Sequence, residues 1–298
     1  MKVSPFNQKT TNPVVMCLGA FDSVHIGHKS LIKKAQELKA KYLADLCVFT
    51  FNNDHSVFAS KFLGEVFTFE ERLVRLENMV VDEVCEAKMS PEFASLSPNE
   101  FLTQLIDNRH IRAFVCGKDF KFGKNAKGNV ELLKEFCNKK NIDLFVCDFV
   151  TDNLGNKIAT TTIKEHLVNG EIIPANNLLG DKYFISGKVV EGRRVGRTLG
   201  FPTANIEFSP TKLRPKSGVY LTEVIIDNKK YGAITNVGSA PTFNQENCLI
   251  ETHIKNFSGD LYEKKLTVYF CDYIRPIMKF STKEELINQL NEDLKVIK

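Results

Sequence analysis

Two histidines, His25 and His28, stand in the run Gly19–His28, which reads GAFDSVHIGH. The run follows a short apolar segment, residues 14–18, and apolar side chains then recur at Leu31, Ile32, Ala35 and Leu38. This spacing predicts a strand followed by a helix whose first turn carries both imidazoles on one face. Backbone N–H groups of a first helical turn attract anions, and Gly27 leaves room for a ligand. The run therefore indicates a nucleotide-phosphate site.

The histidine pair could also be a satisfied pair at the surface or part of a metal site. No carboxylate or cysteine stands at zinc-ligand spacing around the pair. The position directly after an apolar strand is where open α/β sheets bind ligands. The sequence favours the phosphate site, with the imidazoles hydrogen-bonded to developing phosphate charge.

Two further segments of the first half could bind anions. Gly117–Gly128 contains three glycines and four lysines after an expected strand at 113–116, although a solvated loop has the same composition. In Ala159–Lys164 a run of threonines could offer hydroxyls and one cation to phosphate oxygens from the start of a helix. Such a run is also compatible with simple helix capping.

The second half carries a basic, glycine-rich loop, Gly192–Asn205, that leads into an expected strand. Thr203 and Asn205 fall on one face of that strand, and their neutral oxygens suit Mg²⁺ when nucleotide phosphates supply the remaining charge. Glu251 stands in mid-strand among apolar neighbours, which is an awkward place for a carboxylate without a function. It is the candidate general base, and a pairing of Glu251 with an arginine at the surface is the alternative.

Up to about residue 160, apolar strands alternate with helices, which predicts an α/β doubly wound parallel sheet. The expected strands are 14–18, 46–51, 81–85, 113–116 and 144–147, and the expected helices are 69–79, 98–109 and 130–139. Ser97, Pro98 and Glu100 form a capping signature that fixes the start of the second of these helices.

Beyond residue 181, short β-rich runs separated by Gly, Pro and Asn predict a small antiparallel β-barrel with a C-terminal helix. Its expected strands include 183–190, 219–226, 231–236 and 266–270. A second capping box at Ser281–Glu284 predicts the start of the final helix, which carries Leu286, Ile287, Leu290 and Leu294 along one face. We expect the α/β domain at 1–175 and the barrel domain at 176–298.

The 298 residues include 40 Lys and Arg against 36 Asp and Glu, a net charge of +4. This balance argues against a dedicated nucleic-acid or membrane surface. The eight cysteines lie mostly in apolar runs without a Cys-x-x-Cys pair, so we expect reduced core thiols. The N-terminus lacks a signal core and no stretch is long enough to span a bilayer, so we expect a cytoplasmic protein, either a monomer or a weak oligomer.

In their order, and over nearly the whole chain, these motifs resemble the prokaryotic bifunctional riboflavin kinase/FMN adenylyltransferase family, also called FAD synthetases. The runs similar to the kinase module are Gly200–Asn205, Gly218–Tyr220, Asn236–Gly238, Pro241–Phe243 and Glu251–His253. The resemblance implies phosphorylation of riboflavin by ATP to FMN and then adenylylation of FMN by ATP, giving FAD and pyrophosphate. It implies Mg²⁺ for both steps and riboflavin, FMN and ATP as the small-molecule partners. It further implies that the α/β domain at 1–175 is nucleotidyltransferase-like.

The resemblance also implies two sets of site residues. For the kinase step, Glu251 is the base on the ribityl hydroxyl, and Thr203 and Asn205 are ligands of the Mg·nucleotide. Arg275 lies on the flavin side. The phosphate loop is lined by Gly192, Gly196 and Gly200. For the adenylyl step, His25 and His28 are the catalytic pair, and Gly19, Phe21, Asp22 and Gly27 belong to the same motif. Asp119 and Asn125 lie near flavin or nucleotide, and Thr160, Thr161 and Lys164 hold the triphosphate.

The chain departs from the family pattern mostly in its first half. Ser23 replaces a usual glycine, Lys164 a usual arginine, and Ala126 an often basic residue, while residues 52–55 replace a proline-containing turn. In the second half, Ile277 replaces a commonly acidic residue. These departures motivate a second hypothesis, a riboflavin kinase with a weakened or inactive adenylyltransferase half. A third hypothesis is a flavin- or nucleotide-binding regulator without catalysis.

Overall fold

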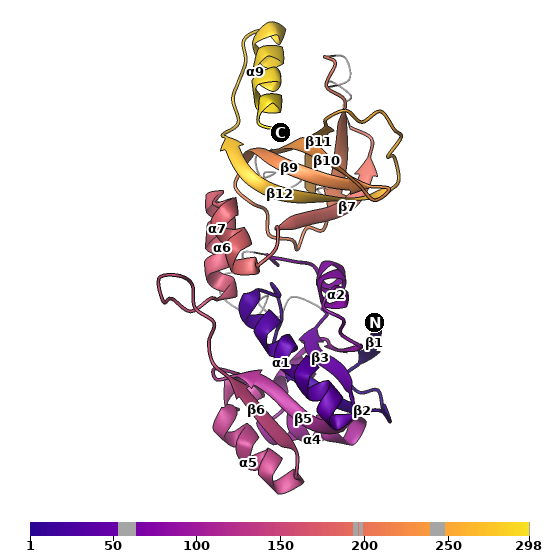
Figure 1. Ribbon diagram of the computed structural model, residues 1–298, viewed down its shortest axis with the longest axis vertical. Helices are drawn as coiled ribbons and strands as arrows, with labels where there is room; N and C mark the ends of the chain where they lie inside the picture. The colour runs from indigo at the N-terminus through magenta and orange to yellow at the C-terminus, as the bar shows by residue number, and fades with distance from the viewer. Residues whose placement is uncertain (53–63, 193–195, 197–198, 239–247, 298) are drawn as a thin grey trace. The chain divides into compact units, whose positions relative to one another are not determined.

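The computed structural model describes residues 1–52, 64–192, 196, 199–238 and 248–297 (Figure 1). The chain divides into two compact units, Met1–Thr160 and Thr161–Lys298. This division falls at the start of a helix, before the border at 175/176 that the sequence suggests, and the domain boundary itself stays a prediction.

Six parallel strands form the sheet of the first unit, in the order β1-β4-β3-β2-β5-β6. They are β1 (Lys2–Pro5), β2 (Pro13–Leu18), β3 (Asp45–Phe51), β4 (Glu83–Ala87), β5 (His110–Gly117) and β6 (Asp143–Cys147). From β2 the chain adds strands first on one side, through β3 and β4, and then on the other, through β5 and β6. The switch point therefore lies between β2 and β5, and open α/β sheets bind ligands at such a point.

Helices cover both faces of this sheet (Figure 1). They are α1 (Ile26–Tyr42) and α2 (Phe69–Glu77) on one face, and α3 (Pro91–Ser95), α4 (Pro98–Asn108) and α5 (Val130–Lys140) on the other. Alternate residues of β2 serve the two faces: Val15 and Cys17 pack with α1, whereas Met16 and Leu18 pack towards α4 and α5. Since both faces are covered, a continuous apolar run is what this strand requires. The predicted doubly wound sheet is confirmed.

Short-range sequence patterns correctly predicted the core face of α1 and the start of α4. The four apolar residues predicted for the core side of α1 are all buried. Ser97 caps α4 with the predicted reciprocal bonds, because its hydroxyl accepts from the Glu100 N–H while the Glu100 carboxylate accepts from the Ser97 N–H. These features are read from consecutive residues, so the sequence alone suffices to predict them.

Strand β1 and helix α3 were not expected from the sequence. β1 has four residues and pairs with β4 at the edge of the sheet. The buried Arg109 holds it there, since its guanidinium donates to Ser4 Oγ at 3.0 Å and to the Phe6 carbonyl at 2.8 Å, beside the Glu83 carboxylate at 3.5 Å. A strand fixed by so distant a residue leaves no periodic signal.

The second unit contains a closed antiparallel barrel in the order β10-β11-β8-β7-β12-β9, as predicted. Its strands are β7 (Phe184–Val190), β8 (Thr203–Phe208), β9 (Gly218–Ile226), β10 (Lys229–Val237), β11 (Cys248–Ile254) and β12 (Lys265–Arg275). Helix α6 (Thr160–Asn169) and helix α7 (Ile172–Leu179) precede it. Inside, three buried hydroxyls bond in series across β9, β10 and β11, with Thr222–Thr235 at 2.8 Å and Thr235–Thr252 at 3.0 Å.

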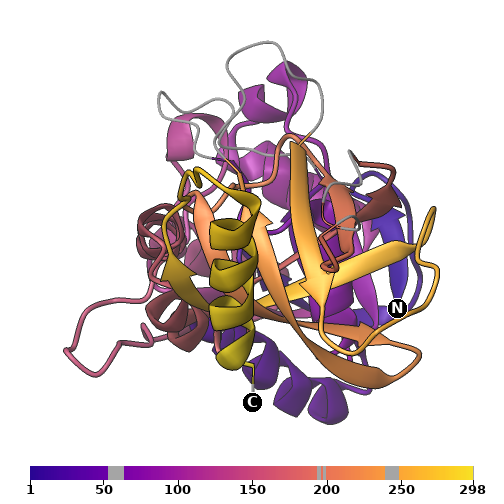
Figure 2. The same ribbon diagram turned by 90° about the horizontal axis from the view of Figure 1, so that it is seen from above.

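The final helix, α9 (Lys283–Lys295), packs on the outside of the barrel (Figure 2). Leu294 contacts an apolar cluster that contains Val219 and Ile234. The helix begins one residue later than the predicted capping box. Thr282 is the N-cap and accepts from the Glu285 N–H, while the Glu285 carboxylate accepts from the N–H of Ser281, not from that of the cap residue.

Seven cysteines can be described, and all of them are free thiols, five of them buried. Within the described parts of the chain no helix is both long and apolar enough to cross a membrane.

Candidate active sites

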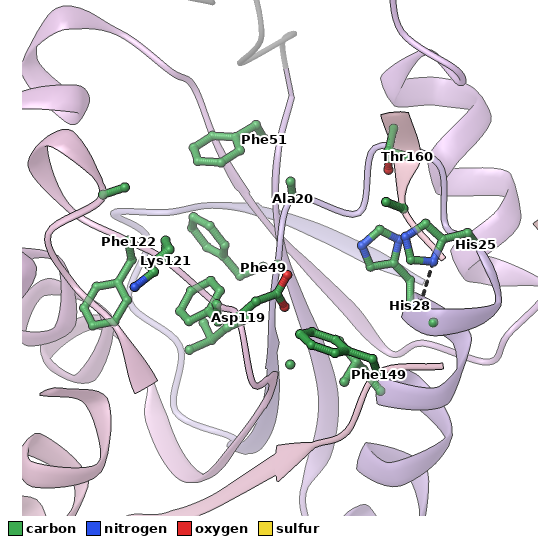
Figure 3. Close-up of a pocket in the computed structure, with 18 of the residues that line it drawn as sticks. Ala20, His25, His28, Phe49, Phe51, Asp119, Lys121, Phe122, Phe149 and Thr160 are labelled. Carbon is green, nitrogen blue, oxygen red and sulfur yellow. Dashed lines mark hydrogen bonds between the residues drawn. The ribbon is translucent and has the colours of Figure 1, made fainter. Parts of the chain in front are cut away.

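A cavity of about 590 Å³ opens in the first unit at the switch point of the sheet. The segments that follow β2 and β5 both line it, together with the segment before α6. Figure 3 shows His25, His28 and Thr160 on one side, Phe49, Phe51 and Phe122 on the other, and Asp119 between them. The cavity thus combines a polar end with an aromatic end.

The two histidines form a stacked pair, with ring centroids 3.8 Å apart and ring planes inclined by 13°. His25 is the N-cap of α1, and its Nδ1 accepts the backbone N–H of His28 at 3.2 Å (Figure 3). One of the first-turn N–H groups that were predicted to attract an anion is therefore already hydrogen-bonded within the protein. Because Nδ1 of a neutral His25 is an acceptor, the ring proton is assigned to Nε2.

Both imidazoles are neutral at physiological pH. Burial lowers the pKa of His25 to about 4, to which the charges of Lys157 and Arg75 also contribute, against opposing effects of a backbone hydrogen bond and of Asp119. Burial lowers the pKa of His28 well below its ordinary value, with the neighbouring His25 adding to this effect. His28 Nδ1 is buried without a hydrogen-bond partner among the described residues.

The turn between β2 and α1 holds this pair by packing. Phe21 is fully buried, and its ring lies against His28 at 4.8 Å between centroids with the planes tilted by 39°, so it supports the imidazole from the core side and does not line the cavity. A Cβ on Gly27 would lie 2.9 Å from Cε1 of His25, so only glycine leaves room for the ring there. Phe21 and Val24 both adopt left-handed backbone conformations, with φ of 49° and 44°.

The residues predicted for the adenylyl site divide into two groups. Gly19, His25, Gly27, His28, Asp119 and Thr160 line the cavity. Phe21, Asp22, Asn125, Thr161 and Lys164 are not among its lining residues. Asn125 is exposed in the short 3₁₀ helix η2 (Lys124–Ala126), and Thr161 and Lys164 belong to the second compact unit.

Lys157 is a cavity residue that the sequence reasoning missed. Its ammonium forms an ion pair with Asp119 and lies 4.3 Å from the centroid of the Phe149 ring. The only sequence signal was its place three residues before Thr160. The aromatic end of the cavity was also not predicted from the sequence, because its phenylalanines come from separate segments.

The candidate site of the second unit lies on the outer face of the barrel, under α9. A groove of about 420 Å³, the helix-side groove, lies between the strands and the apolar side of α9, with Leu286, Leu290 and Leu294 in its wall. An adjoining space of about 620 Å³, the loop-side hollow, includes Gly192 and Tyr262. Both spaces share Thr203 and Asn205.

A row of polar side chains crosses three strands beside these spaces. Asn236 of β10 pairs in register with Glu251 of β11, which in turn pairs with Asn205 of β8. Directly opposed residues point to the same face, so all three side chains share the outer surface. Glu251 is exposed, and it makes no ion pair with an arginine among the residues that can be described. The arginine pairing left open by the sequence is not observed within that part of the chain.

The glycines predicted for the phosphate loop lie in different surroundings. Gly192 lines the loop-side hollow, where a Cβ would lie 2.2 Å from Nδ2 of Asn205. Gly196 lines the helix-side groove, whereas Gly200 has a φ of +84° with open space beside it. Three arginines of the loop, Arg193, Arg194 and Arg197, lie outside the described residues, as do the run 241–243 and residues 53–55.

Arg275 borders the helix-side groove but is engaged within the protein. Its guanidinium forms a bidentate pair with Asp293 of α9, at 2.9 Å from Nε and 2.6 Å from the second terminal nitrogen. Gln289 donates to the same carboxylate at 2.9 Å. The observed contact of Arg275 therefore anchors α9 over the groove.

Comparison with known proteins fits both sites. Residues 7–162 match the FAD synthetase family model, and residues 179–298 match the riboflavin kinase model. The chain belongs to the bifunctional riboflavin kinase/FMN adenylyltransferase family. It is 32% identical to the member from Bacillus subtilis, with 94% of this chain and 90% of the relative covered. It is 30% identical to the member from Escherichia coli K12, with the same shares covered.

A crystal structure named as a macrolide-efflux protein from Streptococcus pneumoniae superposes with a TM-score of 0.89 and 31% identity, covering 100% of this chain and 99% of the other. The curated relatives carry the bifunctional enzyme name instead.

This family membership makes the chain a bifunctional transferase, which phosphorylates riboflavin to FMN and adenylylates FMN to FAD and pyrophosphate. The match to the FAD synthetase model extends over the first unit, and nothing in the comparisons favours an inactive adenylyltransferase half.

The burial of His25 predicts an unusual acid response. The unfolded chain takes up this proton near pH 6.5 and the folded chain only near pH 4, so stability from this group is complete above about pH 6.5 and falls as the pH drops. His25→Asn keeps a capping acceptor but does not titrate. Between pH 7 and pH 5 the first unit of the wild type should lose about 2 kcal/mol more unfolding free energy than this variant. NMR titration of the His25 ring checks the cause, and an ordinary pKa near 6.5 contradicts it.

The Arg275–Asp293 pair predicts a selective defect in the kinase step. Asp293→Ala leaves the guanidinium without its bidentate partner and frees α9 from the barrel, so the KM for riboflavin should rise about tenfold. Glu292→Ala, at an exposed neighbour that forms a surface ion pair with Lys295, should leave that KM unchanged. FAD formation from supplied FMN serves as the folding control. Equal KM values for the two variants would exclude the anchoring role.

Proposed function

We propose that the two reactions use separate sites, adenylylation in the switch-point cavity and phosphorylation on the outer face of the barrel. The observation that carries the first assignment is the stacked, neutral histidine pair at the polar end of a cavity whose other end is aromatic. A phosphate needs hydrogen-bond donors, whereas a flat ring system such as isoalloxazine favours aromatic neighbours.

In adenylylation the FMN phosphate attacks the α-phosphorus of ATP, a new P–O bond forms, and the bond to the β-phosphate breaks to release pyrophosphate. His25 would donate from Nε2 to the phosphate oxygens, because its Nδ1 is already an acceptor. Donors that the fold already holds in place stabilise the charge that develops on those oxygens without reorganisation during the reaction. Thr160 and Lys157 would add a hydroxyl and a cation.

In phosphorylation Glu251 would accept the proton of the ribityl hydroxyl as that oxygen attacks the γ-phosphorus of ATP. Its exposed position in the polar row lets a flavin in the helix-side groove and a nucleotide in the loop-side hollow meet beside it. Phosphoryl transfer depends mainly on positioning and on charge neutralisation.

The residues present suit Mg²⁺ only together with a nucleotide. Thr203 and Asn205 offer neutral oxygens, and the described residues contain no group of three or more His, Cys, Asp and Glu side chains placed for a metal. When bound, the ion would neutralise charge on the phosphates. Gly192 supports this arrangement, because its missing side chain leaves space for the Asn205 amide.

The free thiols of the described cysteines support a reducing compartment, and we extend the proposal to the cytoplasm. A monomer or weak oligomer, without nucleic-acid or membrane partners, remains our expectation.

Opposite losses in two variants test the separation of the sites. Glu251→Gln should lower FMN formation at least about a hundredfold while FAD formation from supplied FMN continues, because the base belongs to the barrel alone. His28→Ala should lower FAD formation from FMN by a similar factor while FMN formation from riboflavin continues. Product analysis with each flavin separately measures both activities.

Two matched substitutions control for charge and for ring removal. Glu263→Gln changes an exposed carboxylate away from the groove, and His110→Ala removes an exposed imidazole at the other end of β5. Both should keep the two activities. Parallel loss of both activities in either test variant contradicts the assignment.

Asn205→Ala tests the metal assignment. Without the amide oxygen, half-maximal phosphorylation of riboflavin should need several-fold more Mg²⁺, while the Mg²⁺ dependence of FAD formation from FMN stays as in the wild type. Magnesium titrations of both reactions measure this, and an unchanged requirement for phosphorylation would show that Asn205 does not hold the ion.

A further inference from the structure

Ser23 occupies a fully buried position directly behind the adenylylation cavity. Its side chain is 0% exposed, and it is not among the residues that line the cavity. Its Oγ lies 2.9 Å from Oγ1 of Thr160, 137 positions later in the chain. Thr160 does line the cavity, beside both histidines. The serine hydroxyl therefore reaches the site only through the threonine.

The backbone around Ser23 fixes the position of this hydroxyl. Phe21 and Val24 are both fully buried in left-handed conformations, which cost free energy for residues with a side chain and persist only where the surroundings enforce them. Arg75 donates to the Val24 carbonyl at 3.2 Å and holds the turn from the side of α2. The turn that carries His25 thus also presents Ser23 to Thr160.

The direction of the hydrogen bond follows from burial and from the chemistry of the ligand. A buried O–H without an acceptor is costly, and Thr160 is the partner that the described structure offers to Ser23. Phosphate oxygens only accept, so a Thr160 hydroxyl that meets a phosphate must donate its own proton. Thr160 then accepts from Ser23, and its O–H is left to point at the ligand.

We propose that Ser23 is a positioning residue for adenylyl transfer, which orients the Thr160 hydroxyl as a donor to the ATP phosphates. Hydrogen bonds in such a chain polarise one another, so the bond from Ser23 strengthens the donor that faces the ligand. This inference rests on the proposed function of Thr160. It gives a role to a serine at a position where the sequence departs from the glycine usual in the family it resembles.

A double-mutant cycle in the full chain tests the proposal. Ser23→Ala should raise the KM for ATP in FAD formation about threefold to tenfold, the range expected for one net hydrogen bond, with the KM for FMN unchanged. Thr160→Val should raise it at least as much. Adding Ser23→Ala to Thr160→Val should not raise the KM for ATP further. Thr160→Ser keeps the hydroxyl, so adding Ser23→Ala to it should raise this KM by the same factor as in the wild type.

Phosphorylation of riboflavin, measured on the same samples, is the folding control and should stay at the wild-type level. If Ser23→Ala prevents folding, Ser23→Gly replaces it, with the same expected shift. If the effects of Ser23→Ala and Thr160→Val on the KM for ATP add in the double variant, the proposal is overturned. It is also overturned if the KM for ATP is unchanged in the Ser23 variants while Thr160→Val is impaired. Both outcomes leave the proposed function intact. An unimpaired Thr160→Val instead removes Thr160 from the phosphate site.

Discussion

The proposed adenylylation site depends on keeping two imidazoles neutral at the carboxyl end of β2. Burial depresses the pKa of both His25 and His28, and in the function we propose the neutral rings would donate to a phosphate. The chain secures this by means that carry no chemistry themselves: a buried Phe21 behind the ring of His28, a missing Cβ at Gly27, and two left-handed residues in the turn. Local strain at such a turn is tolerated because the surrounding core enforces it.

The side chains of the candidate kinase site are positioned by a different arrangement. Its polar residues stand on the outside of a barrel whose interior is closed by packing and by a hydroxyl ladder, so the strand register alone aligns Asn236, Glu251 and Asn205. A helix must then cover this face to form a groove, and the Arg275–Asp293 pair fixes that helix. One candidate site is therefore shaped by burial at a strand end, and the other by a helix fixed over the outer face of a closed barrel.

The sequence was sufficient wherever the determining residues are close in the chain. The apolar run at 14–18 and the Ser97 box predicted their elements because strand and cap signals are local. It was insufficient where distant residues meet. Strand β1 depends on a buried arginine about 100 residues away, Lys157 shows its place only once the cavity is formed, and the pairing of Arg275 with Asp293 is visible only in the folded chain. Charge pairs across the fold leave no periodic signature.

We propose that one chain holds two independent binding sites for a magnesium-bound triphosphate, one in each compact unit. Calorimetric titration of the full-length protein with MgATP in the absence of flavin measures this directly, because no turnover occurs without a flavin acceptor. We expect two molecules of ATP to bind per chain. A stoichiometry of one at saturation would contradict it.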